Sequence, residues 1–132
     1  MKNSRRRNSL RSEKGQTMVE FAIALPVLCL ILFAVIQFGI VFNNYIALTD
    51  ATRAGARKGA VSRQASDPRG ACIKAIQDSS GLDQTKLNPD CQSSWQRASD
   101  VTATATYPYS INLFGLVVAS GNLKATTTER VE

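Results

Sequence analysis

One uncharged block limits what this 132-residue chain can fold into. No formal charge lies between Glu20 and Asp50, and residues 21–42 contain Gln37 as their one clearly polar side chain. As an α-helix, these 22 residues rise about 33 Å, enough to cross a hydrocarbon core of about 30 Å. The other 110 residues are too few to surround so apolar a helix. We therefore predict a membrane-spanning helix at about residues 21–42.

The charges on the two sides of this block predict its orientation. Residues 1–14 carry six basic side chains and one acidic one, which is +5 of the total net charge of +6. Basic residues next to a span remain in the cytoplasm, so we expect a cytoplasmic leader at residues 1–15 and an extracytoplasmic C-terminus. A cleaved secretory signal fits poorly, because its apolar region is about 7–15 residues long. The leader also lacks the interleaved aromatic residues of a nucleic-acid site, so we expect no nucleic-acid partner.

The composition argues against enzymatic chemistry. The chain has no histidine and three cysteines, which removes the commonest general base and the usual metal-ligand sets. A pair of carboxylates for acid–base catalysis beyond the span would have to come from four aspartates. The sequence gives no indication that any two of them lie close together: Asp78, Asp83, Asp90 and Asp100. We predict that the protein is not an enzyme, and expect no metal, cofactor or small-molecule substrate.

The junction between the leader and the apolar block contains a carboxylate, which is an unusual side chain at the edge of an apolar helix. The sequence reads Lys14-Gly15-Gln16-Thr17-Met18-Val19-Glu20-Phe21. An acidic residue at the centre of a membrane helix costs about 3 kcal/mol on insertion scales, and acids near a span are candidates for pairing with a partner. Gln16 and Glu20 are four residues apart and would lie one helical turn from each other.

These features together resemble a known family. A basic leader, a glycine and then a glutamate five residues later before an apolar helix resemble the cleavage region of type IV prepilins. The chain is more closely similar to the TadE-like family, minor pilins of the tight-adherence (type IVb, Flp) pilus, over about residues 12–60. The similarity is carried by Gly15–Ala22, Leu25-Pro26, Gly39 and Asp50–Arg57. Two residues depart from it: Phe21 stands where major pilins carry tyrosine, and Thr52 replaces a usual alanine.

The resemblance implies a function in assembly. It implies that a prepilin peptidase cleaves after Gly15 and leaves Gln16 as the first residue of a 117-residue mature chain. The product would be a minor pilin or pseudopilin of the bacterial inner membrane, whose partners are the peptidase, other pilin subunits, the pilus assembly platform and membrane lipid. We expect Glu20, beside Phe21, to guide docking by pairing with the new α-amine, although an N-terminal glutamine can cyclise and lose that charge. The alternative is an uncleaved, membrane-anchored tethering module.

The helical pattern continues beyond the span, so we predict one long helix over residues 16–66. Small residues recur every four positions on one face of it: Ala47, Ala51, Gly55 and Gly59. Such a stripe permits close packing, and we favour packing under the domain's own sheet over contact with another subunit. The sequence Asp67-Pro68-Arg69-Gly70 predicts the end of this helix.

Residues 67–132 predict a small extracytoplasmic domain, which makes the fold class α+β. A short second helix is expected over residues 70–80, followed by a loop. Cys72 and Cys91 are the only cysteines beyond the span, and an oxidising compartment favours a disulfide between them. Alternating residues predict antiparallel strands at 101–107 and 123–128. The apolar run Ile111–Val118 between them fits either a buried third strand or an exposed loop that touches membrane or partner, and we favour the strand.

Overall fold

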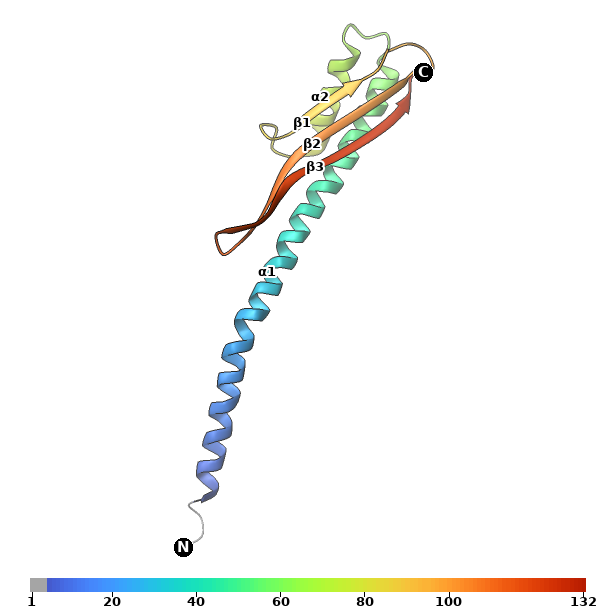
Figure 1. Ribbon diagram of the computed structural model, residues 1–132. Coiled ribbons are helices and arrows are strands. Elements are labelled where there is room, and N and C mark those ends of the chain that lie inside the picture. Colours follow the sequence, from blue (N-terminus) through green and yellow to red (C-terminus); the bar gives the residue numbers. More distant parts are fainter. Residues whose placement is uncertain (1–4) are drawn as a thin grey trace. The chain divides into compact units, whose positions relative to one another are not determined.

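The computed structural model describes residues 5–132, with side chains from residue 15 onward (Figure 1). The elements are helix α1 (Arg5–Val61), helix α2 (Pro68–Ser80) and strands β1 (Asn88–Gln92), β2 (Asp100–Leu113) and β3 (Leu116–Arg130). The chain divides into two compact units, Met1–Ile36 and Gln37–Glu132, and α1 contributes to both. The side chains of residues 1–14, which make up the basic leader before Gly15, lie outside the described part of the chain. A long apolar helix, a short helix and an antiparallel sheet confirm the predicted α+β class.

The apolar part of α1 begins in the first unit and continues into the second, which starts at Gln37. The most apolar 18-residue window of this helix has a mean hydropathy of 2.8 and is not buried against any other described part of the chain. The helix continues through Pro26, and the large apolar side chains along it are exposed, among them Ile23, Leu28 and Ile31. A helix of this length and composition can cross a membrane. The exposed apolar surface therefore suggests a membrane anchor.

The second unit contains a three-stranded antiparallel sheet in the order β1-β2-β3, with helices on one face. Val101, Ala103 and Ala105 of β2 are fully buried on the face toward the helices. The threonines between them face outward and pair across the strands, with hydroxyl distances of 3.3 Å for Thr102–Thr128 and Thr104–Thr126. The alternation in the sequence thus corresponds to one buried and one solvent-facing side of the sheet.

The boundary between the two helices differs from the prediction. Helix α1 ends at Val61, before residue 66, and short turns follow in which Ser62 N donates to Gly59 O and Ala65 N to Ser62 O. Asp67 does not end α1 but caps the start of α2, where its carboxylate accepts from Gly70 N at 2.9 Å. An aspartate before a proline suits a helix start because the proline has no N–H that would need an acceptor.

The third strand is also not where it was expected. Strand β1 forms in a segment predicted as loop, although asparagine, proline and aspartate all disfavour strands. The prediction that the run Ile111–Val118 is a buried strand is wrong. This run forms the ends of β2 and β3 and the turn between them, and its side chains are largely exposed. The helices cover only the opposite end of the hairpin's inner face, where the buried residues of β2 lie.

Candidate functional site

The junction at the start of the apolar segment is helical and exposed. Gln16 and Glu20 lie one turn apart on α1, and Gln16 Nε2 donates a hydrogen bond to Glu20 Oε1 at 3.2 Å. Apart from the backbone of the helix itself, no atom of the described residues lies within 4 Å of the position that a Cβ on Gly15 would occupy. Among the described residues, nothing therefore packs against the helix at this glycine.

The carboxylate at this junction borders directly on apolar surface. Phe21, the next residue, is 64% exposed, and exposed apolar side chains continue beyond it. A single carboxylate with an amide donor beside it is suited to recognition of a cation or an N–H group, because ionised acceptors form the stronger hydrogen bonds. The structure thus brings together Gln16 and Glu20 as the spacing predicted, with Phe21 at the start of the apolar surface.

The stripe of small residues packs within the second unit. Ala51, Gly55 and Gly59 are buried, and Ala47 is half-buried. Gly55 lies under the side chain of Ile76 in α2, and a Cβ on Gly59 would be 3.0 Å from a methyl carbon of Val101 in β2. Small residues therefore let α1 approach both α2 and the sheet closely. These contacts support the interpretation that the stripe lies under the domain's own elements.

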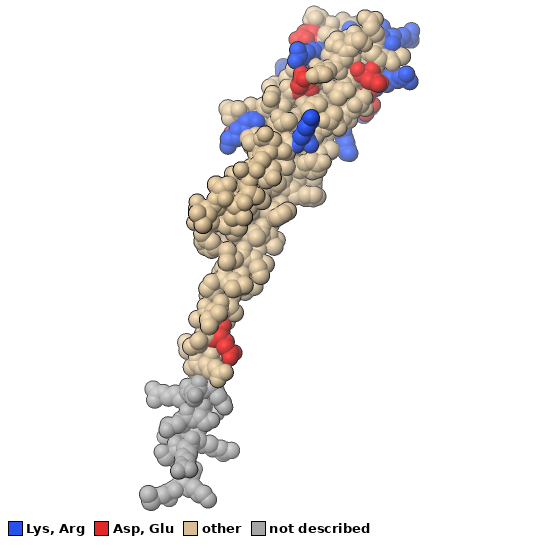
Figure 2. All heavy atoms as spheres, in the orientation of Figure 1, with Lys and Arg blue, Asp and Glu red and all other residues tan. Residues whose placement is uncertain are grey.

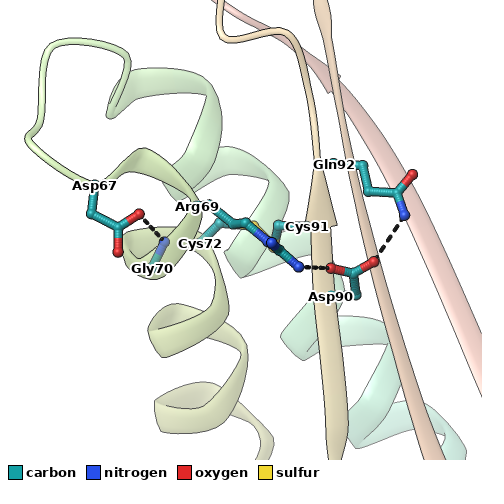
Figure 3. The surroundings of a disulfide bond; sticks show 7 residues. All are labelled: Asp67, Arg69, Gly70, Cys72, Asp90, Cys91 and Gln92. Carbon is teal, nitrogen blue, oxygen red and sulfur yellow. Dashed lines mark hydrogen bonds and ion pairs between the residues drawn. A yellow bond between two sulfur atoms is a disulfide. The ribbon is translucent and has the colours of Figure 1, made fainter.

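The expected disulfide is present and joins α2 to β1 (Figure 3). Cys72 and Cys91 are both buried, with their Cα atoms 6.3 Å apart. Beside them, Arg69 Nη2 contacts Asp90 Oδ1 at 2.8 Å, and Gln92 Nε2 donates to Asp90 Oδ2 at 2.9 Å. The hydrogen bond from Gln92, and then Arg69, lower the pKa of Asp90. Sequence reasoning missed this ion pair, which links residues 21 positions apart without any local pattern.

The four aspartates considered as acid pairs lie on separate elements. Asp78 is exposed on α2, and Asp100 is the first residue of β2. Asp83 accepts from the Thr85 amide at 3.0 Å and from its hydroxyl at 2.7 Å, and these bonds lower its pKa. Asp90 pairs with Arg69 as described. In residues 15–132, whose side chains the structure describes, no group of three histidine, cysteine, aspartate or glutamate residues is arranged to hold a metal ion.

Helix α1 carries the similarity to known proteins. No curated protein and no solved structure matches the chain. Helix α2 and the sheet lie outside the segment that matches a family model, so they are described by their own geometry alone. Residues 15–57, which begin at the junction glycine and end at Arg57, match the family model of the TadE-like protein, so the chain is similar to that family over the part of α1 that carries its junction and its apolar segment.

Proposed function

We propose that the protein is a minor pilin or pseudopilin, a single-pass membrane subunit that acts in assembly of a tight-adherence (type IVb) pilus after cleavage behind Gly15. The observation that carries the proposal is the TadE-like match, which begins at Gly15 and runs through an exposed apolar helix. TadE-like proteins are associated with this pilus and are non-enzymatic in general. The basic leader supports an orientation with the N-terminus in the cytoplasm and the second unit outside it, because basic residues next to a span remain in the cytoplasm. The partners are prepilin peptidase, other pilin subunits and the assembly platform.

The local structure supports cleavage at the junction. Peptide-bond cleavage requires the chain to leave its helical conformation around Gly15 and Gln16. Glycine weakens a helix interior by about 1 kcal/mol relative to alanine. Among the described residues, nothing outside the helix backbone lies within 4 Å of a Cβ position on Gly15. Local opening here disrupts helix hydrogen bonds but no packing against the glycine, so it costs less than opening a buried segment.

The first test is the N-terminus of the protein from its native membrane. We expect intact mass to show a chain that begins at Gln16, and to show the full chain in a strain lacking prepilin peptidase. Intact mass also detects cyclised glutamine, which blocks sequential degradation. Gly15→Leu is expected to abolish processing, whereas Gly39→Leu, at another glycine with open space around it, keeps it. A chain that retains its leader in both strains would contradict the proposal and favour an uncleaved tethering module.

A second test concerns Glu20. Cleavage would create an α-amine on Gln16, one turn or about 6 Å of rise from the Glu20 carboxylate. Pairing with this amine, on the same or a neighbouring helix, would neutralise a carboxylate at the edge of the apolar segment. We expect Glu20→Ala and Glu20→Gln to be cleaved normally but to lose co-purification with the other pilus components.

The matched control for Glu20 is Asp50→Asn. Asp50 is also an exposed acid of α1, with a side chain 64% exposed, and lies 3.5 Å from its neighbour Arg53. An exposed ion pair of this kind contributes little to stability. Removal of the Asp50 charge should therefore leave both cleavage and co-purification unchanged. Normal co-purification of the Glu20→Ala protein would refute the docking role of this carboxylate.

A further inference from the structure

The turn of the β2–β3 hairpin exposes an apolar surface that the proposed function does not use. We call residues 111–118 the hairpin tip. Phe114 and Leu116 are 71% and 73% exposed, and Val117 and Val118 are 62% and 63% exposed. Soluble domains rarely expose contiguous large apolar side chains, and where they do, the patch commonly contacts a membrane or a partner.

The hairpin tip lies within a long uncharged segment. No acidic or basic residue occurs from Val101 to Leu123, and the first charge after the tip is Lys124. On the face that Figure 2 shows, the acidic and basic side chains of the second unit lie away from the end of the hairpin that carries the tip. Entry of this surface into a lipid bilayer therefore avoids the cost of burying a charge.

Within the second unit, the direction of the hairpin brings the tip to the level of Phe42, the end of the apolar segment of α1. The hydroxyls of Thr52 in α1 and Thr127 in β3 are 3.1 Å apart, which aligns the two elements at this point. From Thr52 to Phe42, the last residue of the apolar segment, α1 descends ten residues or about 15 Å. From Thr127 to Val118, β3 spans nine residues or about 30 Å. Figure 1 shows the hairpin running obliquely back along this part of α1, and its length, about twice the descent along α1, suffices to reach the level of Phe42 in spite of this tilt.

The order of residue types along the hairpin repeats the order along α1. On α1, the charged Asp50 is followed toward the membrane by Tyr45 and then by Phe42, both exposed. On the hairpin, Lys124 is followed by Tyr107 and Tyr109 and then by the apolar tip. Tyrosine is enriched at membrane–water interfaces, between charged and apolar zones. Both elements therefore pass from charge through tyrosine to apolar residues in the same direction.

The backbone at the turn favours a role for the exposed phenylalanine. Phe114 and Gly115 both have positive φ, at 50° and 84°. Two-residue hairpin turns of this kind favour asparagine at the first position, because it tolerates the left-handed region, which is strained for a bulky side chain. Phenylalanine is therefore a poor choice for forming the turn itself, but it adds apolar surface at the outermost position of the hairpin.

From these observations we propose that the hairpin tip inserts into the leaflet of the bilayer that faces the second unit, beside the membrane-spanning helix. The protein then contacts the same membrane twice, through α1 and through the tip. The inference rests on α1 spanning a membrane, and it does not depend on cleavage after Gly15 or on entry into a pilus.

Tryptophan reporters in the full-length protein test the insertion. The protein is placed as a single copy in nanodiscs of phosphatidylethanolamine and phosphatidylglycerol with brominated acyl chains, and the signal of Trp95 in the unchanged protein is subtracted. We expect Phe114→Trp to be quenched to an extent comparable with Phe38→Trp, an exposed position of the apolar segment. Ser79→Trp, on the exposed surface of α2, should remain unquenched.

Each other outcome of this experiment overturns the inference. Quenching at position 38 but not at 114 would show a spanning helix whose hairpin remains in water. In a parallel preparation with two copies per nanodisc, a blue shift at position 114 without quenching would show that a second copy covers the tip. No quenching at either position would refute the span itself. The N-terminal mass of the native protein would still report on processing in all three cases.

A second variant separates insertion from folding. Phe114→Asn creates an Asn-Gly pair, which suits this turn, and Leu116→Thr replaces leucine with a β-branched residue, which a strand favours. We expect the two changes together to leave the unfolding transition of the second unit in place. They should reduce the quenching of a Val117→Trp reporter toward the level of the Ser79→Trp protein. Unchanged quenching would overturn the role of the apolar tip.

Discussion

Replacing Cys72 and Cys91 together with alanine is expected to destabilise the second unit by about 3 kcal/mol. The bond closes a loop between residues 19 positions apart, and in the chain-entropy model the removal of such a loop constraint from the unfolded chain costs about this much. Alanine is preferred to serine because both sulfur atoms belong to buried residues, where an unpaired hydroxyl would add its own cost. For a domain of ordinary stability, about 3 kcal/mol is a large fraction of the total.

The loss is expected to be concentrated at β1. This strand has five residues and pairs only with β2, so it forms an edge of the sheet. Besides the strand pairing, the disulfide and the exposed contact between Arg69 and Asp90 attach it to α2. An exposed ion pair contributes little alone. Without the disulfide, amide hydrogens of β1 should therefore exchange faster than those of the paired centre of β2 and β3.

The measurement is denaturant unfolding of the full chain in detergent, followed by the fluorescence of Trp95, which packs against the core of the second unit. Cys29→Ala serves as the control, because Cys29 is the free cysteine of the described residues and lies in the apolar segment. It should leave the transition unchanged. An unfolding midpoint equal to that of the unchanged protein in the double alanine variant would contradict the assigned contribution of the disulfide.

The parts of the fold that were predictable are those with a strong local period or a long uniform run. The uninterrupted apolar block predicted the exposed helix, and the threonine–alanine alternation predicted the paired segments of β2 and β3. The four-residue spacing of Gln16 and Glu20 likewise predicted that they lie one helical turn apart, and in the structure Gln16 Nε2 donates a hydrogen bond to Glu20 Oε1 at 3.2 Å. In each case the pattern lies within one short stretch of sequence, so it can be recognised without knowledge of distant contacts.

The parts that were missed depend on contacts between distant residues. Strand β1 contains Asn88, Pro89 and Asp90, which locally disfavour a strand, and its pairing with β2 outweighs that preference. Asp67 before Pro68 is compatible with either the end or the start of a helix, and the hydrogen bond to Gly70 decides between them. The apolar run at the hairpin tip has no period, so its exposure is evident only once the positions of the helices are known.

Replacing Gly55 with leucine is expected to destabilise the second unit by about 3 kcal/mol or more. A Cβ at this position would overlap the Cγ1 atom of Ile76, which is fully buried, and would lie 3.2 Å from the carbonyl oxygen of Cys72. Overpacking of a core typically costs about 1–3 kcal/mol, and the backbone of α2 cannot yield easily because the disulfide holds it. The larger leucine side chain has no free volume at this contact between α1 and α2.

The milder Gly55→Ala change identifies the contact that is responsible. Alanine favours a helix over glycine by about 1 kcal/mol, so Gly39→Ala, where nothing lies within 4 Å of the added Cβ, should be neutral or stabilising. Gly55→Ala should instead be destabilising. Ile76→Ala removes the overlapping carbon and is itself costly, but the two changes combined should cost less than their sum, because each residue then has room. Additive losses in this double-mutant cycle would show that α1 and α2 do not meet through Gly55 and Ile76, and that the small-residue stripe faces another partner.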